Sequence, residues 1–172
     1  MNEESLTISL KYYGISPWEI EVLYDLFNRK FRIIQEEIDQ TEESFGSALT
    51  ITIPIPFSEE FFKWFEFSTW EKVKSISKEM KRRRGKGHAI IIEIFFAGRP
   101  NVRFVIDLEE NHNFNSAIEK IDFVVELLPY HLNDNEIPND PSEVSYKYDI
   151  ESGKWKVDLV LVGDKKFIFT KK

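Results

Sequence analysis

Several segments of this chain alternate between apolar and polar residues, and this period-two pattern constrains the fold more than any other feature. Successive side chains of a β-strand point to opposite faces, so each such segment predicts a strand with one buried face and one face in water or against a partner. Strands of this kind are typical of a mostly antiparallel sheet with helices on one side. The pattern and the turns between its segments predict about seven strands, near residues 6–12, 49–57, 88–96, 102–109, 144–150, 154–162 and 166–170.

Two details of this pattern make sharper predictions. The segments 88–96 and 102–109 are joined by a short glycine- and proline-containing loop and should form a hairpin whose apolar residues share one face. Pro54 and Pro56 occupy one side of the second strand, and a proline cannot donate to a strand ladder. We therefore expect the end of that strand to lie at a sheet edge.

Three segments have the three-to-four residue spacing of amphipathic helices. The first should run from Pro17 to about Asp39, with Ser16 and Glu19 forming a capping box. The second begins at Ser58, is expected to break near a second capping box at Ser68, and stops at Gly85, while the third covers about 116–129.

The expected element order is βαβαββαβββ, an α+β fold with three helices largely on one face of the sheet. Residues 49–150 contain the order β-α-β-β-α-β, which is that of a ferredoxin-like split βαβ unit. At 172 residues the chain is expected to form a single globular domain over residues 1–172.

Composition limits the environment and the class of partner. The chain contains no cysteine, which favours a reducing compartment, and it begins with an acidic segment rather than a signal peptide, so we expect a cytoplasmic protein. Its apolar runs are too short to predict a membrane span. The formal net charge of −7 argues against general attraction to nucleic acid or anionic lipid, so any such contact must be local.

The sequence contains no phosphate-binding loop, dinucleotide-binding turn, nucleophile elbow or zinc-protease helix. We therefore expect no cofactor, and a binding role is favoured over catalysis. The alternative is a metal-dependent hydrolase. Asp107 and Glu109 lie two apart on a strand and could share a divalent cation with His112, although acidic residues on a solvated strand face are also common.

The segment from Phe57 to His88 stands out from the acidic background. Its first part is crowded with aromatic residues that cannot all face one direction on a helix, so some need a second surface: another helix, a subunit or a ligand pocket. We predict Phe61, Trp64 and Phe67 as partner-binding residues.

The second part of this segment is strongly basic and supports an alternative prediction. Cations in the last turn of a helix complement its dipole, but the dipole does not account for the full charge density. The alternative is therefore a site for phosphate ligands or nucleic acid at Lys81, Arg82, Arg83, Arg84 and Lys86.

The leading hypothesis is a small cytoplasmic protein-interaction module that self-associates. By analogy with other small acidic proteins, it could serve as an inhibitor or as an antitoxin- or immunity-type protein. Nucleic-acid or phosphate binding through the basic run is the first alternative, and metal-dependent hydrolysis is the second.

Overall fold

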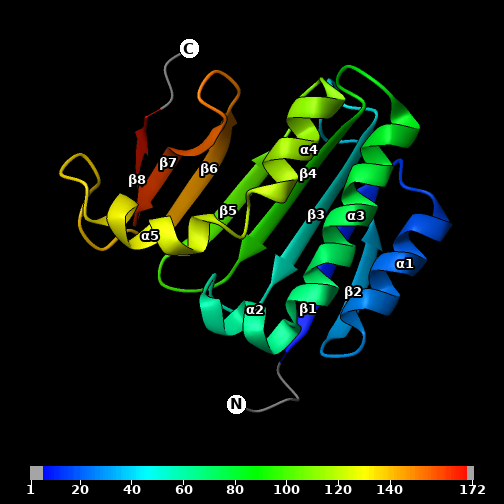
Figure 1. Cartoon of the computed structure of the whole chain (residues 1–172), viewed down its shortest axis with the longest axis horizontal. Helices are drawn as coiled ribbons and strands as arrows, with labels where there is room; N and C mark the ends of the chain where they lie inside the picture. Colours follow the sequence, from blue (N-terminus) through cyan, green and yellow to red (C-terminus); the bar gives the residue numbers. More distant parts are fainter. Residues whose placement is uncertain (1–5, 170–172) are drawn as a thin grey trace.

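A computed structural model describes residues 6–169 of the chain. They form five helices and eight strands that belong to one sheet, shown in Figure 1. The strands are β1 (Thr7–Tyr13), β2 (Arg32–Glu37), β3 (Ser47–Ile53), β4 (Ile90–Phe96), β5 (Asn101–Ile106), β6 (Glu143–Asp149), β7 (Lys154–Val162) and β8 (Lys165–Ile168). The helices are α1 (Pro17–Phe27), α2 (Glu59–Phe65), α3 (Phe67–Arg84), α4 (Asn111–Glu119) and α5 (Val124–Leu132).

The sheet is mixed rather than mostly antiparallel. Its strand order is β2-β1-β3-β4-β5-β6-β7-β8, and the pairs β1–β2, β3–β4 and β5–β6 are parallel. Each parallel pair is connected through helices, so the chain forms three successive β-α-β units and ends in an antiparallel meander. In each unit the two strands are direct neighbours in the sheet. A split β-α-β unit needs another strand between them, so the ferredoxin-like prediction for residues 49–150 is wrong. The α+β class is confirmed.

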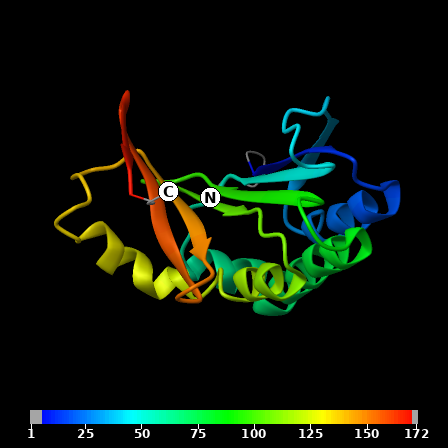
Figure 2. The same ribbon diagram turned by 90° about the horizontal axis from the view of Figure 1, so that it is seen from above.

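The helices cover one face of the sheet and leave the other bare, apart from the segment between β2 and β3, as Figure 2 shows. Tyr13 anchors that segment, because its hydroxyl donates to the carbonyl oxygens of Glu42 and Phe45 at 3.0 and 3.1 Å. Burial alternates strictly along β3, β4 and β5, and their apolar residues lie beneath the helices. The core therefore lies between one sheet face and one helical layer.

The predicted hairpin of β4 and β5 is confirmed, and its apolar residues share one buried face as expected. Ile92 faces Ile106, Ile94 faces Phe104, and Phe96 faces Val102. The prediction for the prolines is wrong. Strand β3 ends at Ile53, before Pro54 and Pro56, and lies inside the sheet between β1 and β4.

The first helix is shorter than predicted. It begins as expected, with Ser16 and Glu19 forming the capping box, but it ends at Phe27. Residues 32–37 form the edge strand β2 instead of two further helical turns. The parallel contact with β1 overrides a local apolar spacing that suits a helix.

The remaining helices differ from the prediction at their junctions. The break after α2 occurs at Glu66, whose φ of +75° interrupts the helix, and no side chain caps α3, so the predicted capping box at Ser68 does not form. The predicted third helix is two helices, α4 and α5, and Pro129 lies inside α5 rather than at its end. Between residues 6 and 169, no helix is long and apolar enough to cross a membrane.

Candidate interaction surface

Most of the aromatic side chains from residue 57 to 67 fill the core. The rings of Phe61 and Phe65 stack at 5.4 Å, and Phe65 also stacks on Phe27 of α1 at 5.5 Å. On the other side, Phe61 meets the edge of Phe96 of β4 at 5.3 Å. Helix α2 thus lies at one end of the sheet, as Figure 1 shows. Its aromatic residues bridge α1 and the central strands.

The three predicted partner-binding residues have different environments. Phe61 is only 1% exposed, so its ring belongs to the core and the prediction is corrected for this residue. Trp64 is half-buried, with its ring against Phe31 at 5.2 Å and the Lys30 ammonium over it at 5.3 Å. Phe67 is 49% exposed, with its inner side stacked on Phe62 at 5.8 Å. Of the three, Phe67 presents the most apolar surface to solvent.

A larger apolar surface lies on α5, which the sequence did not single out. Phe123, Leu127 and Tyr130 are 61%, 46% and 76% exposed, and their spacing of four and three residues places them on one side of the helix. The opposite side of α5 contacts the core through the buried Val124 and the half-buried Leu128. The outer side of a surface helix is normally polar, so this helix is apolar on both sides.

Side chains of α3 hold the start of α5 in place. The Trp70 indole Nε1 donates to the Asp122 carboxylate at 3.3 Å, and the Lys74 ammonium contacts the same carboxylate at 3.2 Å. Phe67 lies one helical turn before Trp70, and Phe123 follows Asp122. These contacts place the first turns of α3 beside the segment that leads into α5.

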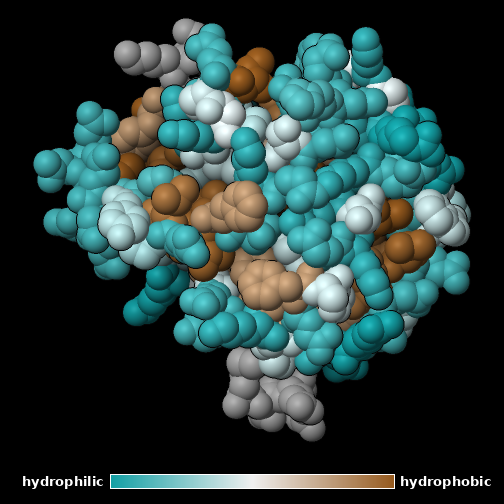
Figure 3. Space-filling view, in the orientation of Figure 1, coloured by the Kyte–Doolittle hydropathy of each residue, from teal (hydrophilic) through white to brown (hydrophobic). Residues whose placement is uncertain are grey.

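We call Phe67, Phe123, Leu127 and Tyr130 the helix-face patch. Figure 3 shows hydrophobic side chains gathered over α5 and near the α2–α3 junction, and smaller hydrophobic groups near α1 and over the C-terminal strands. Exposed apolar residues are common when they are scattered, whereas a group of them on one face is a candidate interaction surface. A sequence signal existed in the spacing of 123, 127 and 130, but it could not distinguish the inner from the outer side of the helix.

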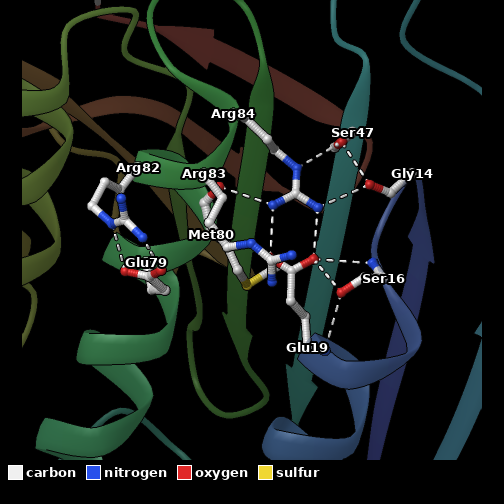
Figure 4. A network of polar contacts seen from close by, with 9 residues as sticks. All are labelled: Gly14, Ser16, Glu19, Ser47, Glu79, Met80, Arg82, Arg83 and Arg84. Atoms are coloured by element: carbon white, nitrogen blue, oxygen red, sulfur yellow. Dashed lines mark hydrogen bonds and ion pairs between the residues drawn. The ribbon is translucent and has the colours of Figure 1, made fainter.

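The basic run does not form a continuous cationic surface. Lys81 is fully buried, and its ammonium donates to the carbonyl oxygen of Gly87 at 3.0 Å. Burial lowers the pKa of Lys81. Arg84 is turned toward α1, as Figure 4 shows. Its guanidinium donates two hydrogen bonds to the Glu19 carboxylate, at 2.7 and 2.8 Å.

Arg84 also makes hydrogen bonds within α3 and to two other parts of the chain. It donates to the hydroxyl of Ser47 at 3.0 Å, to the carbonyl oxygen of Gly14 at 3.0 Å and to that of Met80 at 2.9 Å. The network connects the end of α3 with β3 and with the turn that precedes α1. The charge of Arg84 therefore serves the fold, and the binding prediction is corrected for Lys81 and Arg84.

The other cations of the run diverge. Arg82 pairs with Glu79 on its own helix, Arg83 lies over the Trp18 ring at 5.2 Å, and Lys86 is exposed beyond the helix end. Three cations separated in this way offer less charge to a phosphate backbone than the five consecutive charges of the sequence.

The predicted metal ligands do not converge. Asp107 contacts the Lys147 ammonium at 3.5 Å, Glu109 contacts His88 Nε2 at 2.7 Å, and the side chain of His112 is exposed. In the described part of the chain, no group of three or more histidine or acidic side chains is arranged to hold a metal ion. The hydrolase alternative therefore loses its site.

Comparison with known proteins adds little to this description. No protein family matches the sequence, and no curated protein is similar to it. Among solved structures, a 5-carboxymethyl-2-hydroxymuconate isomerase from Deinococcus radiodurans R1 is similar, with a TM-score of 0.34 and 15% sequence identity over 53% of this chain and 80% of that chain.

Proposed function

We propose that this protein is an interaction module that binds a partner protein through the helix-face patch. The observation that carries the proposal is the outer side of α5, where Phe123, Leu127 and Tyr130 are all exposed on a short helix. Apolar anchors at four- and three-residue spacing are the pattern by which a helix binds an apolar groove. We therefore infer that the partner offers such a groove.

The composition of α5 supports this proposal. Glu126 is its one carboxylate, and His131 is its one residue that can carry positive charge. Aromatic residues are enriched in the buried centres of protein interfaces, where charged residues are depleted. An inhibitor or immunity-type protein would use such a surface to cover part of its target. We include this role in the proposal.

The test compares the wild-type protein with L127D, which places a carboxylate at the centre of the patch. Leu127 is 46% exposed, so the substitution should leave the fold intact. The wild-type protein would be used to capture binding proteins from a lysate of its own cells. Each captured protein would be identified, purified and titrated with the wild type and with L127D by calorimetry. We expect L127D to weaken binding by roughly tenfold or more, since a charge at an apolar contact must lose its water.

I150D is the matched control, because Ile150 is 55% exposed but lies in the turn between β6 and β7. It should bind like the wild type. Equal affinities of all three proteins for the purified partner would refute the assignment of the patch, and so would the failure of any purified candidate to bind the wild type.

A further inference from the structure

Strand β2 leaves one edge of the sheet open. It is the outermost strand in the order and pairs only with β1 among the described strands. Of its six residues, Arg32–Glu37, only Ile33 is partly covered, and the others are exposed. An exposed strand edge is a template for pairing with another strand.

Two hydrogen bonds show which backbone amides of β2 point toward β1 and which point away from it. The amide of Arg32 donates to the Leu6 carbonyl oxygen at 3.0 Å, and that of Ile38 donates to the Tyr12 carbonyl oxygen at 2.8 Å. Backbone groups alternate in direction along a strand, so the amides of Ile33, Gln35 and Glu37 point to the open edge. These residues would form the hydrogen-bonded pairs with an added strand.

The side chains divide between the two faces in the same alternation. Ile33 packs against the core on the helical face, so Arg32, Ile34 and Glu36 lie on the bare face. Ile34 is 59% exposed. The helix α1 does not close the edge, because Gln35 and Glu37, which share its face, are also exposed.

We propose that β2 pairs antiparallel with β2 of a second copy of this chain, around a two-fold axis at Ile34. In this register Ile33 lies opposite Gln35 of the second copy, which uses the backbone groups that point outward. Ile34 then faces Ile34 across the axis, and Arg32 faces Glu36 of the second copy on both sides. These are non-hydrogen-bonded pairs, in which facing side chains approach most closely.

Charge and hydrophobicity select this register among the permitted ones. A shift of two residues in either direction keeps the outward backbone groups paired, but it places Ile34 opposite Arg32 or opposite Glu36. Only the proposed register joins apolar to apolar and cation to anion. Neither Arg32 nor Glu36 has an ion pair with another residue between 6 and 169, so both charges are available.

The opposite edge of the sheet lacks this complementarity. Strand β8 carries Lys165 and Lys166 and no carboxylate, so no register of two β8 strands pairs opposite charges. A two-fold axis also produces a closed dimer rather than an open filament. Because one strand edge is a small contact, we expect a reversible dimer that forms at high protein concentration.

A charge swap tests the register. Sedimentation velocity from low micromolar to near-millimolar concentration would give the dimerisation constant of the wild type, R32E, E36R and the double variant R32E/E36R. Each single variant places like charges opposite each other twice and should weaken dimerisation by roughly tenfold or more. The double variant restores opposite charges and should recover dimerisation. Glu36 lies beside Lys11 of β1, so thermal unfolding of each variant serves as the control for folding.

Cysteine cross-linking tests the axis. The chain has no cysteine, and facing residues of a non-hydrogen-bonded pair have Cα atoms about 4.5 Å apart, within the range of a disulfide. I34C should therefore form a covalent dimer under mild oxidation. I168C is the matched control, because Ile168 is 67% exposed on the opposite edge. It should remain largely monomeric.

Three results would overturn the inference: a wild-type protein that stays monomeric near millimolar concentration, single charge variants that dimerise like the wild type, or I168C that cross-links as readily as I34C. The inference does not depend on the helix-face patch. L127D should dimerise normally, and R32E should bind the proposed partner normally, so the two proposals can fail separately.

Discussion

Glu19 is the residue on which the α1–α3 connection depends. It is 1% exposed, caps α1 by accepting from the Ser16 backbone at 3.0 Å, and receives two hydrogen bonds from Arg84. Burial raises the pKa of Glu19, but hydrogen bonds from Arg84 and Ser16 outweigh burial and lower the pKa to about 2. One carboxylate thus joins a helix start to a helix end that is 65 residues away.

This carboxylate should make stability depend on acid pH. Its pKa is about 2 in the folded chain and 4.5 unfolded, so its contribution is present above 4.5 and is lost as the pH falls toward 2. We expect E19Q to reduce the free energy of unfolding by about 3 kcal/mol at neutral pH, because Arg84 loses its charged partner. The loss of stability between pH 4.5 and 2 should also be shallower in E19Q than in the wild type.

Urea denaturation at a series of pH values would measure both effects. E79Q is the matched control, since the Glu79–Arg82 pair lies on the helix surface with Arg82 70% exposed. Surface pairs contribute little to stability, so E79Q should unfold much like the wild type. Parallel pH profiles for E19Q and the wild type would contradict this account of Glu19.

The Glu19 site also shows what sequence can predict at the residue scale. The capping box depends on residues three apart, so the pattern Ser16-Pro17-Trp18-Glu19 was sufficient to predict it. The contact with Arg84 depends on the packing of two helices, which no local pattern specifies. For the same reason the basic run suggested a cationic surface, although Lys81 and Arg84 are turned inward.

At the scale of elements, the junction of α2 and α3 is strained. Glu66 has φ +75° and ψ 128°, a conformation that glycine adopts far more readily than other residues. The strain lets α2 turn across the end of the sheet while α3 runs along it. We expect E66G to raise the free energy of unfolding by about 0.5–1 kcal/mol, since the exposed Glu66 side chain contributes little that glycine would lose.

Urea denaturation of E66G and S68G separates relief of strain from a general effect of glycine. Ser68 is exposed in the first turn of α3, where glycine lowers helix propensity, so S68G should destabilise by about 0.5 kcal/mol. Destabilisation of similar size in both variants would show that the conformation of Glu66 carries no strain.

The elements that the sequence predicted well are those with a strict local pattern. The β4–β5 hairpin has uninterrupted alternation, and its apolar residues share one face as predicted. Strand β2 has no such pattern, because it is an exposed edge strand whose Ile34 side chain lies in water. Its pairing with β1 is also not local, because α1 separates the two strands in the sequence. The sequence also predicted the α2–α3 and α4–α5 junctions imprecisely. Neither junction contains a glycine, and the position of each depends on tertiary packing.

At the scale of the whole molecule, the core extends unevenly toward the C-terminal strands. In β7, Trp155 meets the Phe104 ring at 5.2 Å and donates from Nε1 to the Ala117 carbonyl oxygen at 3.0 Å, and Val160 is fully buried. All four residues of β8 are exposed. The last meander strand therefore adds little to the core, whereas β7 closes it over β6 and α4.

Two truncations should accordingly have very different effects. A chain ending at Gly163 lacks β8 and the partly buried Phe169, and we expect it to unfold cooperatively with a modestly lower Tm. A chain ending at Asp149 also lacks Trp155 and Val160. Loss of a buried tryptophan alone costs about 3–5 kcal/mol, a large part of the total stability of a domain, so this chain should show no cooperative thermal transition. Circular dichroism melting would measure both, and a cooperative transition in the chain ending at Asp149 would show that β1–β6 and their helices form a core that is stable without β7.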